Sequence, residues 1–169
     1  EHGQKVGQLL ITRGDMEDPA RHTNLLSAFE RLFDWGVIPI INENDAVAVE
    51  EIVYGDNDSL SAHVAVLVRA SKLIILTDID GLYDKDPALY PDARLFEVVE
   101  AITPEICALA RGTGSGLGTG GMETKLKAAK LATSHGIDTY IINGERPEGI
   151  YSLLEGGKAG SWFKAVKTC

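Results

Sequence analysis

The sequence contains little cysteine, few aromatic residues and no long apolar run. Cysteine occurs only at positions 107 and 169, which form neither a CxxC motif nor a metal-ligand spacing. Such sparse use suits a reducing cytoplasm. No run approaches the ~18 apolar residues of a membrane span, and the sequence contains no lipidation motif or internal repeat. We therefore expect a cytoplasmic protein that has no membrane partner.

Positive charge is scarce as well. The chain carries 16 lysine and arginine residues against 25 aspartate and glutamate residues, which gives a net charge of −9. This excess repels the phosphates of nucleic acids and argues against a nucleic-acid partner, although local donors can still hold small anions. The 169 residues are 44% hydrophobic, which is enough for a single domain with a core.

Short apolar runs alternate with segments of helical periodicity. This alternation predicts an α/β fold, a three-layer α/β/α sandwich with one mainly parallel central sheet. Ligands of such sheets bind beyond the carboxyl ends of the strands, so the loops that follow strands form the expected rim of the active site. The expected strands are 5–12, 37–41, 72–77, 94–100 and 138–143, and the tail is either irregular or an edge strand; the expected helices are 18–36, 59–71, 103–112, a segment ending at 134, and 146–156.

A glycine-rich segment precedes the helix that contains Lys125. Residues 116–121 match G-x-G-x-x-G, but a helix precedes them and the next strand ends in Asn143, so a dinucleotide site is disfavoured. Leu126 follows Lys125, where a Walker loop requires serine or threonine. Bare backbone at a helix N-terminus does suit phosphate oxygens, and Lys125 can reach a transferring phosphoryl group. The alternative is a flexible loop with a solvated lysine.

Amides and carboxylates are concentrated in the loops that follow the expected strands. Most acidic residues there are expected to form turns and helix caps, and Asp56 or Asp58 is placed to cap the helix at 59–71. The mixture around residues 42–45 and 56–58 is denser than turns require, and it can bind an amino group. Thr77 and Asp78 open a further loop, where they suit a nucleotide or its Mg²⁺. The sequence contains no protein metal site: "DNDSLS" fails as a calcium loop and the four histidines lack metal spacing.

Several stretches together resemble the amino acid kinase family. They are "LLITRGDMED", "VIPIINENDAV", "GDNDSLSA", "LIILTDIDGLYDKDP", "SGLGTGGMETKLKAA" and "GIDTYIINGERP". The combination of "NENDAV", "GDND" and "GLGTGGMETK" is similar to the branch that phosphorylates the γ-carboxylate of L-glutamate with ATP and Mg²⁺. That reaction gives glutamyl 5-phosphate, in the first step of proline biosynthesis. The family fold is an open, mainly parallel eight-stranded sheet between helix layers.

The resemblance also implies roles for individual residues. Asp45 and Asn57 would bind glutamate with Asn42 nearby, Asp58 would organise the catalytic lysines, and Lys125 would stabilise the transferring phosphoryl group. The residues expected to contact ATP are Thr77, Asp78, Thr119, Gly120, Gly121, Met122, Glu123, Thr124 and Lys125.

The same resemblance bears on the extent of the chain and on its partners. Family members begin with a strand and glycine loop of the form "VKLGTS", which are not found here. We therefore expect residues 1–169 to be the carboxyl-terminal part of one kinase domain, with an incomplete central sheet, with no PUA domain in this chain, and inactive alone. L-proline is the expected feedback inhibitor, and a homo-oligomer is expected. The alternatives are a family member acting on acetylglutamate, aspartate, carbamate or UMP, and a non-catalytic fragment that binds an amino acid.

Overall fold

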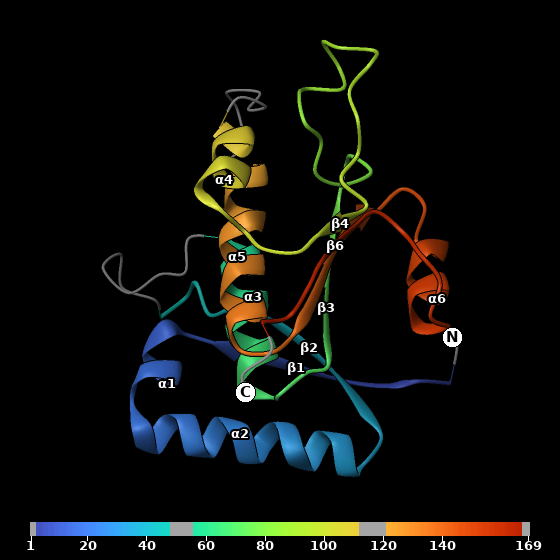
Figure 1. Cartoon of the computed structure of the whole chain (residues 1–169). Helices are drawn as coiled ribbons and strands as arrows, with labels where there is room; N and C mark the ends of the chain where they lie inside the picture. Colours follow the sequence, from blue (N-terminus) through green and yellow to red (C-terminus); the bar gives the residue numbers. More distant parts are fainter. Residues whose placement is uncertain (1–2, 48–55, 112–120, 167–169) are drawn as a thin grey trace.

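The computed structural model describes residues 3–47, 56–111 and 121–166. Figure 1 shows the chain, in which helices and strands alternate through most of the described part. The elements are β1 (Lys5–Ile11), α1 (Arg13–Glu17), α2 (Pro19–Asp34), β2 (Val37–Glu43), α3 (Asn57–Leu67), β3 (Lys72–Thr77), β4 (Val98–Val99), α4 (Pro104–Arg111), α5 (Met122–Ser134), β5 (Asp138–Asn143), α6 (Glu148–Leu154) and β6 (Ser161–Phe163).

A four-stranded sheet forms the centre of the molecule, in the order β3-β5-β6-β4. Helices α3, α4 and α5 lie on one side of it and α6 lies on the other (Figure 1). The alternation of side chains along β5 explains both contacts. Ile141 packs in the cluster that contains residues of α3 and α5, whereas Tyr140 and Ile142 pack with Leu153 of α6. This sheet is therefore the middle layer of an α/β/α sandwich, as predicted.

Strands β1 and β2 form a separate parallel pair, and α2 packs against β2. Phe29 of α2 is only 1% exposed, which makes it the buried anchor of that helix. The opposite face of the pair carries exposed apolar side chains, namely Val6, Leu10, Ile38 and Ile40. Within the described residues no hydrogen bonds join this pair to the four-stranded sheet, which agrees with the expectation of an incomplete central sheet.

Parallel pairing predominates, as the alternating pattern predicted. Among the strands of the described residues, β1 and β2, β3 and β5, and β4 and β6 pair in parallel, and β5 and β6 pair antiparallel. The register aligns Thr77 with Asn143, so β3 and β5 end at the same level. The loops after these two strands therefore leave the sheet side by side.

Aspartates fix the starts of two helices. The Asp18 carboxylate accepts hydrogen bonds from the amides of Ala20 and Arg21 at 3.0 and 2.9 Å, at the start of α2. Asp56 accepts from the Ser59 amide at 2.6 Å and so caps α3. Of the two predicted caps it is Asp56 that acts, which leaves the Asp58 carboxylate available to another helix.

Three local expectations were wrong. The five-residue helix α1 was not predicted, because it has too few residues to show a period; Thr12 and Asp15 hold it through the 2.8 Å bond from the Thr12 amide to the Asp15 carboxylate. The strand expected at 94–100 is reduced to the two residues of β4. Strand β6 lies inside the sheet rather than at an edge, and Ser161 and Phe163 are fully buried.

Candidate active site

Asp58 of α3 and Lys125 of α5 form an ion pair where these two helices pack against each other. The Lys125 Nζ lies 3.2 Å from the Asp58 Oδ2, and the two side chains are 10% and 15% exposed. The hydroxyl of Thr124 donates to the same carboxylate oxygen at 2.7 Å. Asp58 therefore holds a cation and a hydroxyl that come from consecutive residues of the facing helix.

Small residues explain how the short Asp58 side chain reaches the other helix. Ala62 and Ala65 of α3 and Ala129 and Ala132 of α5 are at most 5% exposed and belong to one core cluster. Alanine keeps the two helix axes close, because no large side chain separates them. Both helices therefore contribute to the ion pair: each supplies one charged side chain, and each supplies alanines that let the helices approach closely.

The N-terminus of α5 has the properties of an anion site. Gly121 occupies the cap position in an extended conformation, and no side chain of the described residues accepts a hydrogen bond there as a cap. The first amides of a helix have no partner within the helix, and the helix dipole adds positive potential at that end. Lys125 adds a full charge one turn later. The donor set thus fits the phosphates of a nucleotide.

The predicted nucleotide contacts around this terminus are only partly described. Thr119 and Gly120 lie outside the described residues. Met122 packs its side chain against the core cluster, and Glu123 is exposed, where it pairs with Lys127 at 3.1 Å. The backbone of these two residues, rather than the side chains, is what the geometry offers to a phosphate.

Thr77 and Asp78 form a second group, at the carboxyl end of β3. The Thr77 hydroxyl donates to the Asp78 carboxylate at 3.0 Å, and the Thr77 carbonyl accepts from the Gly144 amide at 2.7 Å. Asp78 is exposed, as a group that meets a ligand should be. The second contact ties the end of β3 to the loop that follows β5.

The predicted substrate residues lie at the end of β2 and the start of α3. Asn42 and Asp45 are exposed, and Asn57 is the first residue of α3. Residues of both elements line a cavity of about 500 Å³, among them Asn57 and Ile41, the neighbour of Asn42. The structure thus brings Asn57 near the strand that carries Asn42, whereas Asp45 does not line this cavity.

Two features of the site were missed by sequence reasoning. The hydroxyl of Thr124, which is also a predicted nucleotide contact, donates to Asp58, and this bond was not predicted; its place beside Lys125 was the available signal. Glu43 is only 9% exposed although the sequence places it in an acidic loop. Alternation along β2 could have indicated this, since Asn42 before it is exposed.

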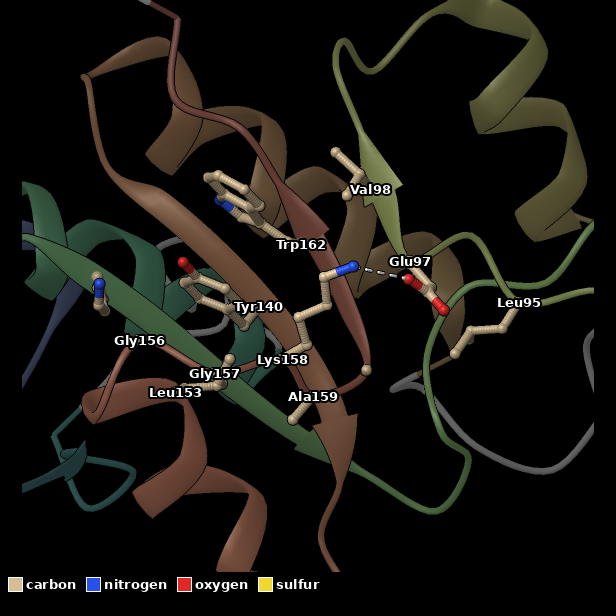
Figure 2. Close-up of a pocket in the computed structure, with 12 residues that line it drawn as sticks. Leu95, Glu97, Val98, Tyr140, Leu153, Gly156, Gly157, Lys158, Ala159 and Trp162 are labelled. Carbon is tan, nitrogen blue, oxygen red and sulfur yellow. Dashed lines mark hydrogen bonds and ion pairs between the residues drawn. The ribbon is translucent and has the colours of Figure 1, made fainter.

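A further cavity of about 410 Å³ lies on the other face of the central sheet, beside α6 (Figure 2). Tyr140 and Trp162 stack on adjacent strands there, with ring centroids 6.0 Å apart, and Lys158 pairs with Glu97 at 3.3 Å. None of the predicted site residues lines this cavity. The candidate active site is therefore on the opposite side of the sheet and at its carboxyl edge.

Neither a protein metal site nor a membrane segment is found in the described ranges. No three His, Cys, Asp or Glu side chains gather there in a way that could hold a metal ion. No helix among these residues is long and apolar enough to cross a bilayer.

Comparison with known proteins places this geometry in context. The sequence pattern of the amino acid kinase family matches residues 1–143. The chain is 52% identical over 167 residues to a glutamate 5-kinase of Clostridium tetani, which covers 99% of this chain and 62% of that protein. It is also 52% identical over 163 residues to the glutamate 5-kinase of Clostridium acetobutylicum, covering 96% of this chain and 61% of the relative. The chain thus spans about three fifths of the length of these relatives.

The fold is shared with solved structures of lower sequence similarity. The isopentenyl phosphate kinase of T. acidophilum superposes with a TM-score of 0.62 at 22% identity, over 96% of this chain and 61% of that one. This likeness supports the three-layer architecture and says nothing about which substrate accepts a phosphoryl group.

Proposed function

The chain belongs to the amino acid kinase family, and on that premise we propose that it is part of a kinase that phosphorylates the γ-carboxylate of L-glutamate with ATP. The product is glutamyl 5-phosphate, which enters proline biosynthesis. The observation that carries the proposal is the Asp58–Lys125 pair, which lies one turn inside the end of α5 at which Gly121 is the cap residue. The two relatives named glutamate 5-kinase favour glutamate as the acceptor.

ATP supplies the phosphoryl group when bound, and its Mg²⁺ neutralises part of the phosphate charge. The backbone amides of residues 121–123 would bind phosphate oxygens, while Thr77 and Asp78 bind the nucleotide at the end of β3. Lys125 would stabilise the negative charge that develops in the transition state. Asp58 restrains the Lys125 ammonium, and the Thr124 hydroxyl fixes Asp58.

The acceptor side needs binding groups but no general base. A carboxylate is already ionised at neutral pH, so its oxygen can attack the γ-phosphorus of ATP once the two are aligned, and ADP leaves as the bond from that phosphorus to the bridging oxygen breaks. Asp45 and Asn57 would bind the amino acid, with Asn42 nearby. Magnesium bound to nucleotides keeps several waters and uses only one or two carboxylates, so it requires no three-residue protein cluster.

We also propose that residues 1–169 are the carboxyl-terminal part of one kinase domain. A strand and a glycine loop from outside this chain would complete the sheet and the phosphate site. The cavity of about 500 Å³ between β2 and α3 and the partial span of the relatives support this. The 169 residues alone are then expected to be inactive. Inhibition by L-proline, a homo-oligomeric state and a cytoplasmic location complete the proposal.

The test is hydroxylamine trapping of the acyl phosphate, with the full-length natural protein, ATP, Mg²⁺ and L-glutamate. We expect glutamyl hydroxamate, and its loss in Lys125→Ala by at least about a hundredfold. Lys130→Ala is the matched control, because Lys130 is exposed on the same helix. Hydroxamate with acetylglutamate or aspartate instead would move the proposal to another acceptor. No signal with any acceptor would refute it.

A further inference from the structure

A cluster around Asp80 joins the two loops that leave the sheet side by side. The Asp80 Oδ1 accepts a hydrogen bond from the Asn143 side-chain amide at 3.0 Å and an ion-paired contact from Arg146. Its Oδ2 accepts from the Tyr83 hydroxyl at 3.4 Å. Asp80 belongs to the loop after β3, whereas Asn143 and Arg146 belong to the end of β5 and the turn beyond it. One carboxylate therefore spans both loops.

The turn that holds Asp80 is itself ordered by local contacts. The Asn143 side-chain oxygen accepts from the Glu145 amide at 2.9 Å, while its nitrogen donates to Asp80. Asn143 thus shapes its own turn and fixes the neighbouring loop at once. Asp80 is 42% exposed at the side chain and Arg146 is 68% exposed, so the amide contact is less screened by solvent than the ion pair.

The residues after Asp80 are anchored separately. The Leu82 amide donates to the hydroxyl of Ser161, which is fully buried, at 2.8 Å. Thr77 is held on the other side by the Gly144 amide. The short segment from Thr77 to Leu82 is therefore fixed at both ends, and Asp80 fixes its middle.

We propose that Asp80 is a positioning residue for the nucleotide, acting by holding the loop that presents Thr77 and Asp78 against the turn after β5. The inference rests on the proposed function, in which Thr77 and Asp78 contact ATP. Asp80 lies two residues beyond Asp78, and its side chain is occupied by protein donors. It therefore acts through the loop rather than by contacting the reacting atoms.

This role predicts a selective defect. Loss of the Asp80 carboxylate frees the loop, so nucleotide binding must order it again at the expense of affinity. We expect Asp80→Ala to raise the KM for ATP and the Kd for a fluorescent ATP analogue about tenfold, the loss expected for hydrogen bonds to a charged group. The KM for glutamate and kcat at saturating ATP should change less than about twofold.

The order of the variants tests the geometry. Asp80→Asn keeps an oxygen for the Asn143 amide and should recover part of the affinity, whereas Arg146→Ala should have the smallest effect because that side chain is mostly exposed. Asp138→Ala is the matched control. Asp138 also holds a loop, through the Ala165 amide at 2.9 Å, but it lies at the opposite end of β5.

The experiment uses the full-length natural protein, with analogue binding and steady-state kinetics measured on each variant. A tenfold loss of affinity in Asp80→Ala and wild-type affinity in Asp138→Ala would support the inference. Wild-type affinity in Asp80→Ala, or an equal loss in Asp138→Ala, would overturn it while the kinase reaction stands. If Asp80→Ala does not fold, Asp80→Asn decides: a loss of affinity larger than in Arg146→Ala and Asp138→Ala would support the inference, and wild-type affinity would overturn it. A wild-type protein that binds no nucleotide would overturn both proposals.

Discussion

Replacing Asp58 by Asn should lower the free energy of unfolding by about 2 kcal/mol. Breaking a fully buried ion pair costs about 3–5 kcal/mol, because the remaining charge stays in a poor solvent. The Asp58 and Lys125 side chains are 15% and 10% exposed, and Asn keeps an oxygen for the Thr124 hydroxyl, so the cost falls below that range. Lys125→Met should cost about as much, since it removes the other charge.

The double variant isolates the interaction between the two charges. When both are removed, neither residue is left as a buried charge without the other, so the loss should be about 1–2 kcal/mol smaller than the sum of the single losses. Urea unfolding of the four proteins in the cycle measures this coupling. A parallel cycle on Glu123 and Lys127, an exposed pair on the same helix with 3.1 Å between the charged atoms, should give less than about 0.5 kcal/mol. Additive losses for Asp58 and Lys125 would refute the reasoning.

Two further predictions concern the backbone and acid stability. Gly160 has φ +60°, and a Cβ there would overlap the Ile141 carbonyl oxygen, so Gly160→Ala should lower the free energy of unfolding in urea by more than about 2 kcal/mol. Gly156 has φ +86° with open space around it, so Gly156→Ala should lower that free energy by about 1 kcal/mol. Hydrogen bonds from the Thr12 hydroxyl, then from its amide, lower the pKa of Asp15 below its usual value of 3.8. The stability that the ionised Asp15 carboxylate adds is therefore complete above pH 3.8 and is lost as the pH falls through the lowered pKa. Asp15→Asn should remove this acid dependence from unfolding curves measured at a series of pH values. Equal pH dependence in the two proteins would contradict the prediction.

Sequence reasoning succeeded where one local pattern decided the structure. The apolar run at 72–77 became β3 with the same bounds, and the run at 138–143 became β5. Pro104 begins α4, as its position in the first turn predicted. Strands β3 and β5 each contain a run of apolar residues and α4 is marked by a start signal, so tertiary contacts had little to override.

The features that the sequence did not predict depend on contacts between segments that lie far apart in the chain. Ser161 is buried because the Leu82 amide bonds to its hydroxyl across 79 positions, and no local signal at Ser161 announces that partner. The split into two sheets likewise follows from which strands lie side by side. Of the candidate site, the proximity of Asp58 to Lys125 was expected from family resemblance rather than from spacing, because the two residues are 67 positions apart.

Strand β5 resists a slip of its pairing register because its two faces differ in shape. Ile141 fits a layer rich in alanine, whereas Tyr140 packs beside Trp162 on the face toward α6. A shift of the pairing register by one residue would turn the Tyr140 ring toward the alanine-rich layer and Ile141 toward α6. The packing of the core therefore fixes the level at which Thr77 and Asn143 leave the sheet. The contacts that Asp80 makes at the edge of the sheet depend on that level.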